Sequence, residues 1–257
     1  MRNNPIIRIS IVMLICLTVL GLQSCIRCSV NYKRVVANDD ITTKNIPLEK
    51  FDDISVAGPF DLIYEQEPGG SPRLVVEGPS NIIEVLKIKQ DDNEINIGTK
   101  NGVNVEMKGQ KLTIHAYSEG LESLIVTGSG KAFIHSDLKT EEMDLKVTGS
   151  GSIESQKLQC LEELSTTVTG SGYITLSEAN SPKINTMVTG SGDTHLKSLT
   201  CGTLKANITG SGHIDLEGIA EKADFSITGS GNIYANRLET KKVTKNITGS
   251  GKVETSE

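Results

Sequence analysis

The sequence is poor in aromatic residues and carries no excess of positive charge. Phe, Trp and Tyr make up 4% of its 257 residues, and Trp is absent. A globular enzyme core usually contains more large aromatic side chains, whereas the narrow core of a solenoid can be filled by small aliphatic residues. The formal net charge of −6 argues against nucleic acid as a partner, since nucleic-acid binding calls for a basic surface. It also argues against broad electrostatic adhesion to anionic lipid.

Cysteine is scarce, and its five positions form no zinc-binding pattern. Cys16 lies in an apolar leader, while Cys25 and Cys28 lie at its boundary, where a CxxC spacing does not favour a redox role. Cys160 and Cys201 occupy equivalent positions two repeats apart, which is about 9.6 Å at the usual strand spacing. Because a disulfide does not tolerate that separation, we expect both to be unpaired. The sequence predicts no metal and no cofactor.

The one long apolar run lies at the N-terminus and is typical of a secretory signal peptide. Arg2 and Arg8 are followed by an apolar stretch at residues 9–22, and then by Leu22-Gln23-Ser24-Cys25. A charged start, a short apolar run and a small residue before the cut are the features of such a signal. The run is too short to favour the alternative, a membrane-spanning helix. We therefore expect residues 1–24 to be removed.

The Leu-x-small-Cys ending resembles the bacterial lipobox, although Gln23 departs from its usual pattern. The resemblance implies that Cys25 is the lipid attachment site, and several acyl chains give stable membrane attachment. Residues 25–45 are polar without a clear period, and we interpret them as a tether. No Asp follows Cys25, so the expected location is the outer membrane of a bacterial cell envelope. The periplasmic and surface faces both remain open.

The motif Thr-Gly-Ser-Gly recurs throughout the second half of the chain. Val or Ile precedes every copy. Successive copies follow at a nearly constant interval of about 20 residues, and such self-similarity is the signature of a repeat architecture. The copies start at Thr127, Thr148, Thr169, Thr189, Thr209, Thr228 and Thr248.

Residues around each copy alternate between apolar and polar types, which is typical of strands. A repeat of this length is too short for a helical crossover between parallel strands, so each repeat is expected to form one coil of a parallel β-helix. Each coil would hold a strand, a Gly-Ser-Gly corner, a short second strand, a turn and an apolar anchor. The predicted fold class is therefore all-β, a β-solenoid with coils of about 20 residues. The anchors are Leu138, Leu158, Ala179, Leu199, Ile219 and Leu238.

The chain before the repeats also alternates like strands but lacks the motif. The dipeptides Gly58-Pro59 and Gly78-Pro79 predict turns between these expected strands. We interpret residues 46–120 as irregular early coils or as a capping sheet on the same core. The predicted organisation is thus a signal peptide, a tether, this N-terminal β segment, and the repeats at residues 121–257.

Together these features resemble one known family. The opening Phe-x-x-Ile-x-Val-x-Gly-x-Phe-x-Leu runs from Phe51 to Leu62 and accompanies the lipobox and the serial Gly-Ser-Gly corners. This pattern is similar to the putative auto-transporter adhesin, head GIN domain family, whose members are mainly secreted or lipid-anchored proteins of Bacteroidetes-type bacteria. The resemblance covers residues 46–254 and implies a right-handed β-helix with an adhesin-like role. Its motifs are structural, so it implies no catalytic or binding residue.

Threading the repeat predicts which side chains line up on the outer surface. Asp193 should stack beside His213, and His195 beside Asp215, with tyrosines and Thr175 on the same face. One hypothesis is a weak metal-binding or carbohydrate-binding patch. The favoured alternative is that opposite charges are placed on neighbouring strands to avoid like-charge stacking.

The function that follows is a non-enzymatic, envelope-anchored scaffold with an adhesin-like surface. Its expected partners are the membrane, through the lipid anchor, and envelope glycans or proteins. A glycan-binding or polysaccharide-active β-helix protein is the alternative, but its chemistry needs clustered acids beside a base, and threading finds no strong cluster. The sequence leaves the oligomeric state open.

Overall fold

A computed structural model describes residues 32–256, and Arg34–Glu257 form one compact unit. Within the described residues the chain is nearly all β, with one short helix of four residues, α2 (Ser80–Ile83). The expected signal peptide and the lipid attachment site Cys25 lie outside the described residues. In the part of the chain that is described, no helix is long and apolar enough to cross a membrane.

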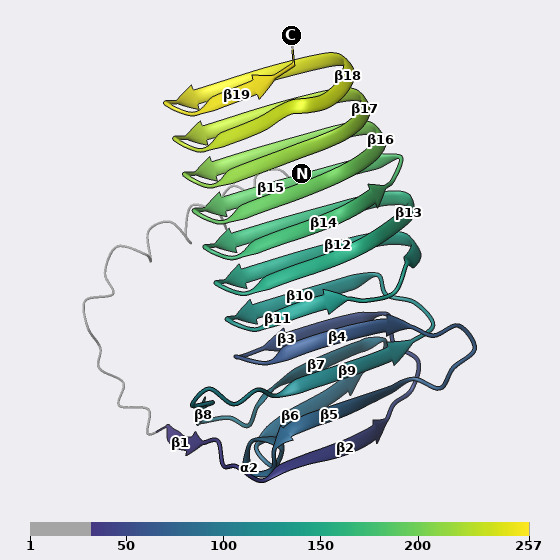
Figure 1. Ribbon diagram of the computed structural model, residues 1–257, viewed down its shortest axis with the longest axis vertical. Coiled ribbons are helices and arrows are strands. Elements are labelled where there is room, and N and C mark those ends of the chain that lie inside the picture. Colours follow the sequence, from purple (N-terminus) through teal and green to yellow (C-terminus); the bar gives the residue numbers. More distant parts are fainter. Residues whose placement is uncertain (1–31, 257) are drawn as a thin grey trace, which may run out of the picture. The chain divides into compact units, whose positions relative to one another are not determined.

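The second half of the chain forms the predicted solenoid. Its strands pair in parallel, each with its equivalent one coil away, and they stack as the layers seen in Figure 1. The prediction of an all-β solenoid, one coil to each repeat, is confirmed from β10 to β19. The strands are β10 (Ser123–Gly128), β11 (Lys131–Ile134), β12 (Leu138–Gly149), β13 (Ser152–Gly170), β14 (Tyr173–Asn180), β15 (Lys183–Gly190), β16 (Asp193–Gly210), β17 (His213–Gly229), β18 (Asn232–Gly249) and β19 (Lys252–Thr255).

Each Thr-Gly-Ser-Gly motif is a corner between two strands. The first glycine of the motif has a positive φ, for example +117° at Gly170, which side chains other than glycine rarely adopt. The second glycine is needed for close approach, since a Cβ on Gly212 would overlap the carbonyl oxygen of Gly192. The serine N–H between them donates to the coil below, as Ser171 does to the Gly149 carbonyl at 2.8 Å. The motif is thus an architectural element of the stack.

The core of the solenoid is a narrow column of aliphatic side chains from the inward-facing slots. Thr166 and Thr186 are buried in this column, and their hydroxyls join in a hydrogen bond of 2.8 Å. Such pairing offsets the cost of burying a hydroxyl group. Five of the six predicted anchors are buried, namely Leu138, Leu158, Ala179, Leu199 and Leu238.

The sixth anchor prediction, Ile219, is wrong. Ile219 is 54% exposed, and Gly218 occupies the anchor column between Leu199 and Leu238. The coil that runs from Thr209 to Thr228 is one residue shorter than the coil before it. The missing residue shifts the register, so a fixed offset from the preceding corner no longer reaches the inward side.

The N-terminal segment is continuous with the solenoid. Its strands β3 and β4 pair in parallel with β10 and β11, so they form one more coil beneath the first Thr-Gly-Ser-Gly corner. Gly58 takes the corner position, and its N–H donates to the Thr127 carbonyl at 2.9 Å. The strands are β1 (Lys33–Val36), β2 (Ile41–Pro47), β3 (Asp53–Ala57), β4 (Asp61–Gln66), β5 (Arg73–Pro79), β6 (Leu86–Asp91), β7 (Glu94–Thr99), β8 (Val103–Glu106) and β9 (Thr113–Ser118).

The remaining N-terminal strands make a mixed sheet that closes this end of the core. β7 and β9 continue the parallel stack under β3 and β4, whereas β2, β5 and β6 pair antiparallel. Phe51, Phe60 and Tyr64 are fully buried here. Early coil and capping sheet are therefore both present; we call β2–β9 with α2 the cap.

Part of the stretch interpreted as a tether forms strands. β1 and β2 lie within residues 33–47, and β2 runs along β5 from Ile41 opposite Pro79 to Pro47 opposite Arg73. Most of the β2 side chains are exposed, so the strand has no apolar alternation to reveal it. Residues 25–31, the first part of the expected tether, lie outside the described residues.

Candidate functional site

The outer columns of the solenoid lie in the predicted register. Asp193 pairs with His213, and His195 pairs with Asp215, on the adjacent strands β16 and β17. Thr175 and Tyr234 continue the second column on the coils below and above. The structure thus brings all four predicted patch residues together on one flat face.

Only one of the two predicted side-chain pairs forms. His195 Nδ1 lies 2.7 Å from Asp215 Oδ2, with both side chains about one-third exposed, at 34% and 35%. Asp193 Oδ1 instead accepts a hydrogen bond from the His213 backbone N–H at 3.1 Å. The His213 ring lies beside the Tyr234 ring, with 5.9 Å between centroids. The patch therefore contains one His–Asp side-chain contact and one hydrogen bond from a backbone N–H to an aspartate, and not two side-chain pairs.

The chemistry available to this patch is modest. Among residues 32–256 no group of three His, Cys, Asp or Glu side chains is arranged to hold a metal ion. Tyr173 is occupied by a hydrogen bond from its hydroxyl to Glu154 Oε1 at 2.9 Å. Nδ1 of His213 is buried and has no hydrogen-bond partner within the described part of the chain. The patch can offer polar and aromatic contacts to a ligand on its surface.

A second feature, which no sequence motif predicts, is an acidic hollow on another face. It has a volume of about 490 Å³ and is lined by Glu122, Glu142, Asp144 and Glu163 from three successive coils. Lys183 from the next coil binds Glu163 at 2.5 Å, and this contact lowers the pKa of the Glu163 carboxyl. Of its acids, only Glu142 and Glu163 share an outward column, so the threaded columns indicate part of this hollow and not the whole.

Charge repulsion is evident just below this hollow. The pKa of Asp53 on β3 is raised first by partial burial and then by neighbouring carboxylates. Like charges on adjacent strands are destabilising. The carboxylates that raise this pKa belong to Asp52, Glu122, Glu94 and Asp144.

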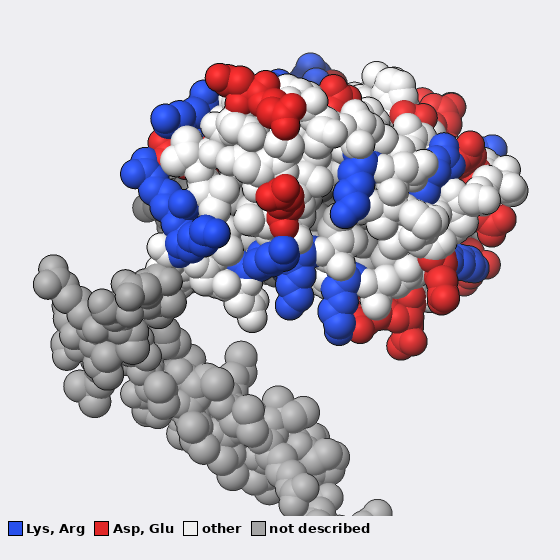
Figure 2. All heavy atoms as spheres, turned by 90° about the horizontal axis from the view of Figure 1, so that it is seen from below, with Lys and Arg blue, Asp and Glu red and all other residues white. Residues whose placement is uncertain are grey.

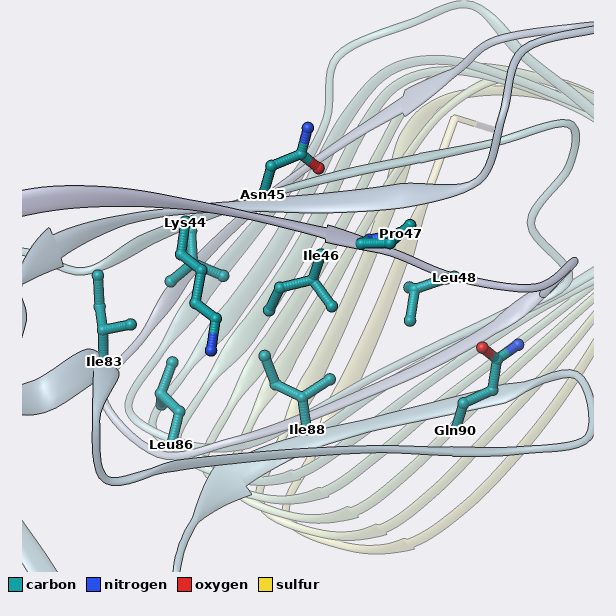
Figure 3. A pocket seen from close by; sticks show the side chains of 10 residues that line it. Lys44, Asn45, Ile46, Pro47, Leu48, Ile83, Leu86, Ile88 and Gln90 are labelled. Carbon is teal, nitrogen blue, oxygen red and sulfur yellow. The ribbon is translucent and has the colours of Figure 1, made fainter.

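The cap contains an apolar pocket of about 440 Å³ between β2 and β6. Ile46 from β2 and Ile88 from β6 face each other across it, and Leu86 lies beside Ile88 (Figure 3). In the same view the exposed side chain of Lys44 extends from β2 along the pocket toward Leu86. Seen from this end, the molecule shows both lysine or arginine and acidic side chains, with no uniformly basic surface (Figure 2).

The two described cysteines play no part in any of these sites. Cys160 and Cys201 are free and buried, as predicted from their spacing. Burial raises the pKa of the Cys160 thiol to about 12 and that of Cys201 to about 11. Because the thiolate is the reactive form, both are inert core residues.

Comparison with protein families assigns the chain. The family model described as putative auto-transporter adhesin, head GIN domain, matches residues 50–179 and 165–256. The chain belongs to this head GIN domain family. Comparison with curated proteins gives no match.

Solved structures share the fold of this head GIN domain protein. A putative adhesin from Bacteroides fragilis NCTC 9343 is 21% identical with a TM-score of 0.75, covering 85% of this chain and 98% of that one. A putative lipid binding protein from Parabacteroides distasonis ATCC 8503 is 24% identical with a TM-score of 0.75, covering 88% and 100%. A putative adhesin from Parabacteroides merdae ATCC 43184 is 21% identical with a TM-score of 0.66, covering 87% and 99%. The chain is an adhesin-like β-solenoid.

Proposed function

We propose that this head GIN domain protein is a non-enzymatic scaffold, attached to the bacterial cell envelope through Cys25, that presents its solenoid faces to other molecules. The observation that carries the proposal is the unbroken parallel stack from β3 and β4 to β19. Such a stack offers long flat columns of side chains. Recognition by such a surface depends on which residues align, because repeat solenoids bind through extended faces.

The lipid anchor is supported by the sequence of the leader. A charged start, the apolar stretch and the ending Leu22-Gln23-Ser24-Cys25 precede the folded unit. We propose the outer membrane as the location, since no Asp follows Cys25.

Fractionation and protease shaving of intact cells test this function. The wild-type chain should co-purify with outer membranes, while Cys25→Ser should lose acyl labelling and leave the membrane fraction. Surface display predicts that external protease removes the solenoid from intact cells. Protection in intact cells but not in lysed cells would contradict display, and membrane retention of Cys25→Ser would contradict lipid anchoring.

Glycan binding at the patch on β16 and β17 is the alternative that the aligned columns allow. His195→Ala with His213→Ala would remove both imidazoles from that face. Reduced retention of this variant on envelope glycans, with the matched exposed change Lys197→Ala retained as wild type, would support the alternative. Equal retention of all three proteins would exclude the patch as the binding site.

The cap pocket favours a second candidate function, binding of an alkyl chain with an anionic head. Its apolar walls suit an alkyl chain, and the Lys44 ammonium would meet the head group. One protein of the same fold is described as a putative lipid binding protein. Ile88→Trp should fill the pocket and abolish binding of a fluorescent fatty acid, while Lys44→Gln should weaken that binding. Fatty-acid binding that is unchanged in the Ile88→Trp variant would contradict this site.

A further inference from the structure

Charge is separated along one face of the solenoid. We define the leading face as the exposed side chains between the column of Glu142 and each Thr-Gly-Ser-Gly corner, from β10 to β18. Its lower half carries the acidic hollow, with Lys146 as the one base among these side chains. Its upper half carries lysines, with Asp224 as the one acid. The exposed lysines of the upper half are Lys205, Lys222 and Lys242.

The register of the strands places these charges in common columns. One column runs Glu142, Glu163, Lys183, Thr203, Lys222 and Lys242 on successive coils. The sign changes at Lys183, where the Glu163–Lys183 ion pair joins the two halves. Both signs are thus present on one chain, but they are segregated along the stack rather than alternated.

Segregation of this kind costs free energy in an isolated chain. Like charges on neighbouring strands repel each other, whereas an alternating arrangement of the same residues would pair them. Like charges also repel each other in the upper half, since Lys222 and Lys242 occupy adjacent positions in one column. A partner with the reverse charge order would bring each half opposite a half of opposite net charge.

The middle of the leading face is less charged and carries an exposed apolar side chain. Met187 on β15 is 46% exposed and lies between Thr167 and Asn207 in its column. Its corner, at Thr189, is the fourth of the seven. The face therefore has an apolar centre with an acidic and a basic half on either side.

We propose that the leading faces of two copies of this chain pack against each other in antiparallel orientation, about a two-fold axis at β15. Reversing the coil order places Glu142 of one copy opposite Lys222 of the other, and the net negative lower half opposite the net positive upper half. Asp144 then faces Asp224, which is a like-charged contact within this arrangement. Met187 meets its own counterpart at the axis, and so does Lys183, whose charge is paired with Glu163. An isologous interface needs a self-complementary patch of this form.

The size of the face is sufficient for a weak dimer. Six coil spacings give a length of about 29 Å, and the six residue steps from the outermost column to the corner give a width of about 20 Å. Each copy would bury roughly 600 Å², or about 1,200 Å² in total, which is the lower limit of specific interfaces. The charged halves make the association dependent on salt, since ionic screening weakens exposed pairs.

This pairing deepens the proposed function by naming a partner, a second copy. The two cap ends of the pair lie at opposite ends, so the arrangement suits chains anchored on two facing membranes. This arrangement between two membranes rests on the proposed envelope anchor, whereas the pairing itself does not. Failure of surface display in the shaving experiment would leave the pairing intact, so the two proposals can fail separately.

Zero-length carbodiimide cross-linking of the purified full chain tests the pairing. Within one copy, Lys222 and Glu142 are four coils apart, about 19 Å by the strand spacing, so a bond between them reports contact between copies. We expect peptides joining Lys222 to Glu142, beside the intrachain Lys183–Glu163 bond that serves as a positive control. The control bond without any bond between copies, at the highest soluble concentration, would overturn the proposal.

Charge exchange gives the sharper test. One variant carries Lys205→Glu with Lys222→Glu, and the other carries Glu142→Lys with Asp144→Lys; all four sites are exposed, so folding should be retained. Each variant alone should be monomeric by sedimentation under conditions where the wild type dimerises, and an equimolar mixture should regain the dimer. Dimers of either variant alone, or a mixture that stays monomeric although both variants show wild-type circular dichroism, would contradict the proposed orientation.

Discussion

The two ends of the solenoid differ in how they close the core. At the N-terminal end, large aromatic side chains such as Phe51, Phe60 and Tyr64 are fully buried under the antiparallel strands of the cap. At the other end, β18 and β19 follow the same repeat but leave Ile247 44% exposed in what is an inward slot elsewhere. The repeat thus specifies register and stacking, whereas closure of the core depends on sequence that does not repeat.

The open end is charged in a way that fits its exposure. Lys245 takes an inward slot of the last coil and is exposed, and its ammonium donates to the Thr255 hydroxyl at 2.8 Å. Lysines on an edge discourage further strand pairing. Charged side chains thus line the exposed edge at β18 and β19, whereas apolar packing closes the core at the cap.

Removing an aromatic side chain from the cap should have the largest effect. Phe60→Ala should lower the free energy of unfolding by about 3–5 kcal/mol, the usual cost of such a deletion in a packed core. Phe225→Ala is the matched change near the open end, where it is equally buried. Because terminal coils can unravel without the rest, its global effect should be smaller. Urea denaturation of both variants measures the difference, and a larger loss for Phe225→Ala would refute the distinction between the ends.

A corner substitution should have the next largest effect. Gly212→Ala drives a methyl group into the Gly192 carbonyl oxygen and should cost about 1–3 kcal/mol through overpacking. Gly120→Ala is the control, since its added Cβ would meet no atom within 4 Å. Thermal unfolding compares them, and equal midpoints would show that the corner does not need glycine for close approach.

Breaking the buried threonine pair should have a smaller effect that depends on how it is broken. Thr166→Val leaves the Thr186 hydroxyl buried without a partner, which costs about 1–3 kcal/mol. Changing both threonines to Val removes both polar groups and should be nearly neutral. Chemical denaturation of the single and double variants checks this, and a double variant less stable than the single one would argue against the hydrogen bond seen here.

The smallest effect is expected at Ile219. Its side chain is exposed, so Ile219→Thr should change the free energy of unfolding by less than about 0.5 kcal/mol. An anchor in the core would instead lose several times as much. A loss comparable to that of Leu199→Thr, measured in the same denaturant series, would restore Ile219 to the core.

Much of the solenoid could be predicted because its repeat carries its own register. The Thr-Gly-Ser-Gly spacing indicates the coil length and the pairing of Asp193 with His213 and of His195 with Asp215. Side-chain direction could not follow from register alone, and so His213 meets Asp193 through its backbone N–H rather than its ring. The anchor position of the short coil from Thr209 to Thr228 moves to Gly218, and predicting this requires knowing where that coil lacks a residue.

The cap could be predicted only in outline. β2 lacks apolar alternation because it is an edge strand with exposed side chains, so its sequence has the character of a tether. β3 and β10 lie far apart in the chain, and Gly58 is the one sequence feature that indicates their pairing. The acidic hollow escapes prediction because its members belong to different coils, and none of them forms a recognisable motif.

Hydrogen exchange of the full chain, followed by mass spectrometry, tests the difference between the two ends most directly. Amide protons in β19 and in the second half of β18 should exchange fastest, and protection should rise toward β10, β3 and β4. Exchange reports local opening free energies, so it compares the ends within one molecule. Uniform protection along the stack, or a cap that exchanges before the last coil, would contradict the account.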